Sequence, residues 1–452
     1  MSSWLDHNPS SVPADRCAAL TLSAALLASL VTAAPASAQT ASPVDPVPFT
    51  SFLHGLSNAR ATEFIGQAGV AVPDEATFEQ ARDHLLRVYG GQDVRRSFLQ
   101  DGQTLDCIPL AEQPAKRLRG LTSFAAPPPF SPQVAFGKPA TPTDGAVDLP
   151  AEAAKPACPD GSFAMPRTTL EQISAFGSLM AFFDKGPNGA GRVHVPGDTL
   201  DEPPNTDGHA YAYAYQSVDN WGGQSSQSLY DPFVDTARGG VFSLMQNWYV
   251  GGSGTGLQTA EVGWHNYPAR NNDQYSRLFA YYTADGYQKA KCYNYDCGAF
   301  VQVAGAPISL GQRWTVYSVP GGAQYYITIS YYLYQGNWWL AYGDGWVGYY
   351  PGSLYGGGQL SRNATEIQFG TESVGTAGSW PPEGSGYFAS AGWPYSGYQR
   401  AIYYRASNGA FQYPSLTSLQ PSPSCYTDTN QTWGGSYWQY YFFLGGPGGA
   451  GC

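Results

Sequence analysis

Glutamate is scarce in the C-terminal part of this chain. Between Asn205 and Cys452 there are only four: Glu261, Glu366, Glu372 and Glu383. Two carboxyl groups held together in a partly dry cleft resist ionising together, so one keeps its proton while the other is charged. Such a pair supplies a base that deprotonates water and an acid that protonates a leaving nitrogen. A pair of these glutamates could therefore hydrolyse peptide bonds without a metal.

The flanking residues favour Glu261 and Glu372 as this pair. Glu261 precedes Val-Gly-Trp in an apolar, extended segment, so we expect its carboxylate on the concave face of a sheet. Glu372 follows Phe-Gly-Thr. We assign the two residues jointly to the roles of acid and base, and leave open which residue has which role. We interpret Glu366 and Glu383 as solvated or capping residues, with Glu383 in a Pro/Gly loop.

Both segments resemble motifs of the neprosin family, which are secreted glutamic peptidases. Glu261-Val-Gly-Trp264 resembles the family's Glu-x-Gly-Trp, and Phe369-Gly-Thr-Glu372 resembles its Trp/Phe-Gly-Gly-Glu, with threonine in place of the second glycine. In the family, these motifs carry the catalytic pair. Further motifs resemble the family's in order: Phe-Ser-x-x-Gln-x-Trp at 242–248, Asn-Trp-Trp-Leu at 337–340, and Gly-Tyr-Tyr-Pro at 348–351 for the family's Gly-Tyr-Trp-Pro.

The resemblance runs from about residue 100 to residue 452. It implies a β-sandwich, an acid-acting endopeptidase that cuts next to proline, and a proline-rich peptide or protein as substrate. It also suggests substrate-binding residues. Gln246 is a candidate contact to a substrate carbonyl, or a hydrogen-bonding core residue. Trp264, Trp338 and Trp339 could stack on proline rings in a cleft, or pack in the core.

Other protein classes could use the same residues. A retaining or inverting glycosidase also works with two carboxylates on a β-sandwich, and a carbohydrate-binding module would need only the aromatic faces. A Ser-His-Asp hydrolase would have to use His209 or His265, and the chain has no Gly-x-Ser-x-Gly motif. Neither histidine lies at a ligand spacing from a cysteine, so we expect no metal and no cofactor.

Residues 208–452 have the pattern of a β domain. In His-Ala-Tyr-Ala-Tyr-Ala-Tyr, from His209 to Tyr215, tyrosines and alanines alternate strictly, which predicts a strand with two different faces. We expect further strands at 241–250, 258–264, 277–283, 299–303, 325–333, 338–342, 366–369, 386–388 and 438–444. Many short strands without intervening helices favour an antiparallel sandwich of two packed sheets.

Residues 39–124 have a different pattern and predict a smaller α+β pro-domain. Pro73-Asp74-Glu75 can start a helix towards Tyr89. Asp101-Gly102 can turn the chain between two extended runs. The following residues, 103–115, resemble the activation peptide that precedes neprosin catalytic domains. Residues 125–207 read as a Pro-rich linker and remaining pro-segment, with maturation expected at 185–206. The resemblance implies that the pro-segment inhibits the enzyme.

The N-terminus predicts a signal peptide over residues 1–38, and hence secretion. An apolar, Ala-rich run ends in Ala36-Ser37-Ala38, which suits cleavage before Gln39. Six cysteines follow this segment, an even number that predicts disulfides in an oxidising compartment. Proximity pairs Cys292 with Cys297, closure of the C-terminal region pairs Cys425 with Cys452, and Cys107 and Cys158 remain.

The charge of the chain excludes some partners. The formal net charge is −11, whereas a nucleic-acid-binding protein needs a basic patch. No second apolar run of about 18 residues could anchor the chain in a membrane after the signal peptide. Charged residues make up only 13% of the chain, which leaves little charge repulsion in acid and is compatible with an acid-acting enzyme or with a neutral lectin.

Overall fold

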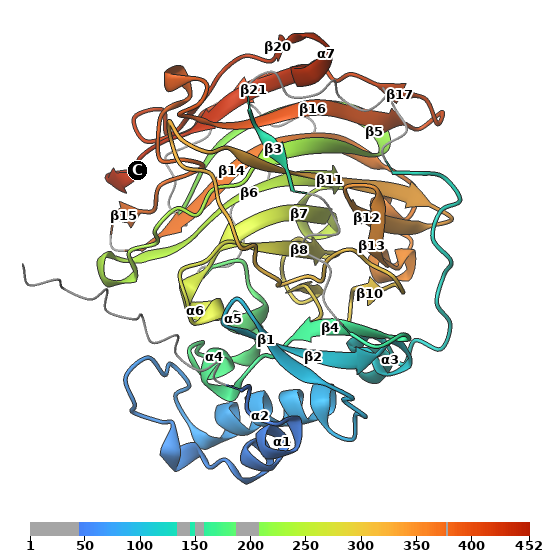
Figure 1. The fold of residues 1–452 in the computed structure, drawn as a ribbon, viewed down its shortest axis with the longest axis vertical. Coiled ribbons are helices and arrows are strands. Elements are labelled where there is room, and N and C mark those ends of the chain that lie inside the picture. The colour runs from blue at the N-terminus through green and yellow to red at the C-terminus, as the bar shows by residue number, and fades with distance from the viewer. Residues whose placement is uncertain (1–44, 133–144, 150–157, 187–207, 377) are drawn as a thin grey trace, which may run out of the picture. The chain divides into compact units, whose positions relative to one another are not determined.

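The structure is a computed structural model that describes residues 45–132, 145–149, 158–186, 208–376 and 378–452 (Figure 1). The predicted signal peptide lies outside the described residues, as does the predicted maturation segment from residue 187 on. The described residues from Asp45 onwards belong to one compact unit. None of the helices within them is long and apolar enough to cross a membrane.

The predicted β-sandwich is confirmed, and strand β5 (His209–Ser228) belongs to both of its layers. The first layer continues from the N-terminal half of β5 through β14 (Ala364–Gly375), β6 (Gly240–Gly251), β7 (Gln258–Asn266), β8 (Arg277–Thr283) and β9 (Lys291–Tyr293), with β18 (Thr417–Leu419) on the other side of β5. The second layer contains the C-terminal half of β5, β11 (Tyr325–Tyr334), β12 (Asn337–Tyr342), β13 (Gly345–Tyr350), β10 (Val301–Gln302), β16 (Gly397–Ala406), β17 (Phe411–Gln412) and β21 (Tyr440–Gly445).

Two glycines allow β5 to pass from one layer to the other. Residues up to Asn220 pair with β14, and residues from Gly222 on pair with β11. Gly222 has a φ of +99°, and a Cβ atom there would lie 1.9 Å from the carbonyl oxygen of Tyr331. A Cβ atom on Gly223 would lie 2.4 Å from the carbonyl oxygen of Tyr403. Only glycine fits at such close backbone contacts, so this pair sets the position of the bend.

Aromatic side chains fill the space between the layers. Trp264 from β7 is fully buried and donates its indole N–H to the carbonyl of Ser228, 2.9 Å away. Trp338 from β12 is also fully buried, and its ring lies 5.8 Å from that of Tyr249 on β6. Each such ring adds a large apolar area to the core, and the indole N–H is satisfied by a carbonyl.

The N-terminal part is the predicted α+β unit. Its elements are α1 (Phe49–Asn58), α2 (Glu75–Tyr89), β1 (Ser97–Gln100), β2 (Gln103–Pro109), α3 (Pro114–Arg119), β4 (Ser162–Pro166), α4 (Leu170–Ser174) and α5 (Leu179–Phe183). Asp74 caps α2 by accepting the N–H of Thr77 at 2.8 Å. Asp101 and Gly102 both have positive φ and turn β1 into β2, as predicted.

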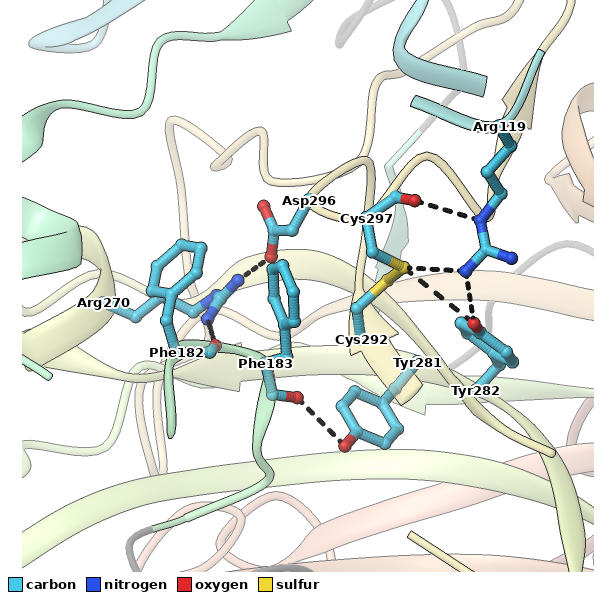
Figure 2. The surroundings of a disulfide bond; sticks show 9 residues. All are labelled: Arg119, Phe182, Phe183, Arg270, Tyr281, Tyr282, Cys292, Asp296 and Cys297. Carbon is cyan, nitrogen blue, oxygen red and sulfur yellow. Dashed lines mark hydrogen bonds and ion pairs between the residues drawn. A yellow bond between two sulfur atoms is a disulfide. The ribbon is translucent and has the colours of Figure 1, made fainter. Parts of the chain in front are cut away.

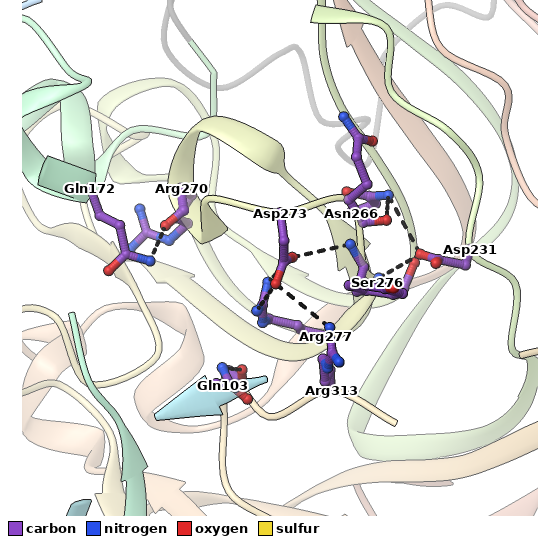
Figure 3. Close-up of polar contacts among 12 residues, drawn as sticks. Gln103, Gln172, Asp231, Asn266, Arg270, Asp273, Ser276, Arg277 and Arg313 are labelled. Carbon is purple, nitrogen blue, oxygen red and sulfur yellow. Dashed lines mark hydrogen bonds and ion pairs between the residues drawn. The ribbon is translucent and has the colours of Figure 1, made fainter. Parts of the chain in front are cut away.

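Polar contacts join this unit to the β domain (Figure 3). Gln103 donates to the carbonyl of Gly311 at 2.7 Å, and Gln172 donates to the carbonyl of Arg270 at 3.0 Å. The short elements that complete the fold are β3 (Val147–Asp148), α6 (Pro268–Asn271), β15 (Ser379–Trp380), β19 (Thr427–Asp428), β20 (Thr432–Trp433), α7 (Gly435–Trp438) and β22 (Gly449–Ala450). All three predicted disulfides, Cys107–Cys158, Cys292–Cys297 and Cys425–Cys452, are present.

Some predicted strands were wrong or misplaced. Residues 386–388 form no strand, because Gly386 has a φ of +83° and donates its N–H to the carbonyl of Glu383 in a turn. The last long strand begins at Tyr440 rather than 438, after a short helix. The predicted strand at 299–303 is reduced to Val301–Gln302. In each case, local turn geometry overrode the apolar pattern.

Candidate active site

Strand register places Glu261 and Glu372 on the same face of the first layer. Glu261 on β7 pairs with Trp248 on β6, and Glu372 on β14 pairs with Leu244 on β6. Directly paired residues point to the same side of a sheet, and residues two apart on one strand do so as well. Trp248, Gln246 and Leu244 therefore share one face, and both glutamates project from it.

The ammonium of Lys185 joins the two carboxylates. Its Nζ lies 2.7 Å from Oε2 of Glu261 and 2.6 Å from Oε2 of Glu372. The side chains of the three residues are between 0% and 2% exposed, so the group is sealed from solvent in this structure. The rings of Trp248 and Tyr281 also lie near the ammonium, 5.4 and 6.0 Å from it. Two glutamates far apart in the chain thus converge on one nitrogen atom.

Glu261 has two more hydrogen-bond donors. Its Oε1 accepts the hydroxyl of Thr259 and the hydroxyl of Tyr287, each at 2.7 Å. Thr259 lies two residues earlier on β7 and therefore on the same face. Tyr287 lies between β8 and β9 with a φ of +60°, and its N–H is bound by the hydroxyl of Thr283 at 2.8 Å. Unlike the ammonium of Lys185, these two hydroxyl donors to Glu261 are neutral.

Glu372 has a different environment. Its Oε1 accepts Nδ1–H of His209 at 2.7 Å, and its Oε2 accepts the side-chain amide of Gln246 at 3.0 Å. Burial by itself raises the pKa of Glu372, but the charge of Lys185 and the hydrogen bond from His209 outweigh burial and lower it. Glu372 is thus held as a carboxylate. For Lys185, burial lowers the pKa, but the two carboxylates raise it above its ordinary value.

The segment that carries Lys185 is bound through its backbone and side chains (Figure 2). Tyr281 donates its hydroxyl to the carbonyl of Phe183 at 3.1 Å. Arg270 donates to the carbonyl of Phe182 at 2.6 Å and stacks on its ring at 4.1 Å. Asp184, next to Lys185, forms an ion pair with Lys291. These contacts hold Lys185 over the two glutamates, and we call residues 179–186 the covering segment.

Sequence reasoning missed several residues of this site. His209 entered only as a member of a rejected triad, and Lys185 only as the start of a loop. Thr259 and Tyr287 were not singled out. The alternation from His209 to Tyr215 does place the histidine on the tyrosine face, which was an available signal. No comparable local signal marks Lys185, because it reaches Glu261 across 76 residues of chain.

Of the two positions expected for the three candidate tryptophans, the structure shows the core and not a cleft. Trp264, Trp338 and Trp339 are fully buried in the core. Trp264 alternates with Glu261 and Gly263 along β7, so it points into the sandwich, away from the glutamates. Trp339 lies in the second layer, where its ring packs 4.5 Å from the ring of Tyr349. Gln246, by contrast, does lie at the site.

The interpretation of Glu366 and Glu383 as solvated residues was also wrong, since both are fully buried. Glu366 accepts hydrogen bonds from Ser217 at 2.9 Å and Gln368 at 2.6 Å. Glu383 accepts the hydroxyl of Thr371 at 2.6 Å, and burial raises its pKa well above the ordinary value. Thr371, the residue that departs from the family motif, alternates with Glu372 and serves this second carboxyl group on the opposite face.

A metal centre is not evident among the described residues, where no three His, Cys, Asp or Glu side chains form a ligand cluster. The chemistry that the arrangement offers is that of two carboxylates, supported by hydroxyl, imidazole and amide donors, around one point. A group bound at that point could exchange protons with both glutamates.

Comparison with known proteins agrees with the motifs. Residues 239–447 match the sequence model of the family described as Neprosin. A solved structure described as scytalido-glutamic peptidase with a transition state analog inhibitor is similar at a TM-score of 0.27 and 11% identity, over 52% of this chain and 97% of that one. The family match includes both Glu261 and Glu372, and it confirms that residues 239–447 of this chain form a neprosin-family domain.

Proposed function

We propose that this chain is a secreted glutamic endopeptidase, made as an inactive precursor, that hydrolyses peptide bonds next to proline in acid, with Glu261 and Glu372 activating water. The neprosin domain supports the assignment to glutamic peptidases. The observation that carries the assignment of residues is the convergence of the two buried carboxylates on Lys185 Nζ.

The nitrogen of Lys185 stands in for the attacking water. A water molecule at that point would be bound by both carboxylates once the segment has left. We assign Glu372 as the base, because His209 and Gln246 remain as donors that favour its ionised form. We assign Glu261 as the acid, because its other donors are the neutral hydroxyls of Thr259 and Tyr287.

The reaction then needs no other group. Glu372 takes a proton from water as its oxygen attacks the carbonyl carbon, and the proton of Glu261 stabilises the developing oxyanion. The proton held by Glu372 passes to the leaving nitrogen as the C–N bond breaks. The products are a carboxylic acid and an amine, the proton of Glu261 returns to it, and one water is consumed.

The position of Lys185 in the chain supports the proposal that the protein is made as an inactive precursor. The residue lies N-terminal to the catalytic domain, at the start of the predicted maturation segment, and it binds both glutamates of the site. While its ammonium is present, a water molecule cannot take that position. Secretion is supported by the predicted signal peptide and the three disulfides. The preference for proline comes from the family resemblance alone.

The test is cleavage of proline-containing peptides by the purified full-length chain in acid, followed by mass spectrometry. Glu261→Gln and Glu372→Gln should each abolish cleavage. Glu366→Gln is the matched control, since Glu366 is also fully buried and lies on the same strand as Glu372. Full activity in either of the first two variants would disprove the pair. Equal cleavage of peptides with and without proline would disprove the preference.

A further inference from the structure

Lys291 is a buried cation whose carboxylate partner belongs to the covering segment. Lys291 is 5% exposed, and its ammonium forms an ion pair with Asp184, the residue next to Lys185. The same ammonium donates to the carbonyl of Tyr287 at 2.5 Å. In the proposed mature enzyme the segment is gone, so Lys291 loses its carboxylate and keeps only the carbonyl.

We propose that Lys291 and the carbonyl of Tyr287 form a substrate subsite for an acidic side chain. An aspartate or glutamate close to the scissile bond would take the place of Asp184. This inference rests on the proposed peptidase function and specifies its substrate class, because it adds an acidic residue to the peptide that the site selects.

The subsite would favour an acidic side chain because leaving the ammonium of Lys291 without an anion costs free energy. A substrate that takes the place of the segment would bury the ammonium of Lys291 again. A buried ammonium without an anion is strongly disfavoured, whereas a substrate carboxylate would form a charge-assisted hydrogen bond with it. Asp285, a carboxylate close to Lys291 in the sequence, is already engaged. It accepts the backbone N–H groups of Lys289 at 2.8 Å and Ala290 at 2.9 Å. A substrate carboxylate is therefore the natural partner for Lys291.

The subsite is held in place relative to the reacting atoms. Tyr287 binds Glu261 through its hydroxyl and Lys291 through its carbonyl, so a single residue connects a catalytic glutamate to the ammonium of Lys291. The end of helix α5 is also bound through its backbone, because the carbonyls of Phe182 and Phe183 accept hydrogen bonds from Arg270 and Tyr281 of the catalytic domain. A substrate backbone bound by the same donors would bring a side chain to Lys291.

The first test compares peptides that differ only by Asp or Asn, placed in turn at each position flanking the scissile bond. The acid-activated full-length protein is assayed at about pH 5, where an aspartate side chain is mostly ionised. At one position, kcat/KM should be about tenfold higher for Asp than for Asn. Lys291→Gln should lose the preference, so that its kcat/KM values for the Asp and Asn peptides become equal. Lys289→Gln, a change at an exposed lysine nearby, should retain the preference.

A second test does not depend on folding of the Lys291 variant. The peptide of residues 179–186 is added to the activated wild-type protein as an inhibitor, beside its D184N form. The D184N peptide should inhibit about tenfold more weakly, and equal inhibition would overturn the subsite. Cleavage without any Asp preference would likewise overturn the subsite but leave the peptidase. No cleavage of any peptide, with Glu372→Gln indistinguishable from wild type, would overturn both.

Discussion

Replacing Lys185 by methionine tests whether this residue keeps the precursor inactive. The change keeps a long apolar side chain but removes the ammonium that contacts both glutamates at 2.6 and 2.7 Å. Removing one partner of a buried ion pair costs ~3–5 kcal/mol. The lower end applies here, because one carboxylate of the variant can take up a proton. A loss of ~3 kcal/mol raises the population of the open precursor about a hundredfold.

The assay follows the uncut precursor in two ways. Hydrogen exchange over residues 179–186 should be faster in Lys185→Met, and the initial rate of peptide cleavage should rise before any shortening of the chain is visible on a gel. Lys289→Met is the control, since it makes the same substitution at an exposed lysine. In Lys185→Met/Glu372→Gln, exchange should be fast without cleavage. A Lys185→Met precursor that is as protected and as inactive as wild type would refute the reasoning.

Three further predictions concern pH, catalysis and stability. The pKa of Glu372 is lowered in the precursor, so the ionised carboxylate stabilises the closed form above the ordinary pKa of 4.5, and this stabilisation is lost as the pH falls below that value. Hydrogen exchange over residues 179–186 should therefore accelerate only in acid. A pH-independent exchange rate would contradict this. His209→Ala removes a donor to Glu372, so kcat should fall about tenfold and the acidic limb of its pH profile should move to higher pH, while an unchanged limb would exclude a positioning role. Thr371→Ala leaves Glu383 without its 2.6 Å donor and should lower Tm by about 2–4 °C in calorimetry, and an unchanged Tm would show that this hydrogen bond adds nothing.

Much of the fold is encoded locally. The alternation after His209 predicted the start of β5, and the apolar spacing after Asp74 predicted α2. Asp101-Gly102 predicted a hairpin turn that the structure confirms, because both residues tolerate a positive φ. These features depend on neighbouring residues only, so they can be recognised without any tertiary contact.

The candidate site was only partly accessible in this way. Glu261, Glu372 and Gln246 were chosen from short motifs, and all three lie at the site. For Trp264, three residues from Glu261, the sequence left cleft and core open, because the direction of its side chain depends on which face of β7 meets the other layer. Glu383 was assigned to a solvated loop, but the structure buries it against Thr371.

The sequence alone determined the strand-rich composition, the disulfide partners and the two motif glutamates. Only the tertiary structure decided that Lys185 lies between those glutamates and that His209 binds one of them from 163 residues away. The physical reason is that strand register and the path of the covering segment set these contacts. A shift of one residue in register would turn each side chain to the opposite face, and no local pattern in the chain specifies that choice.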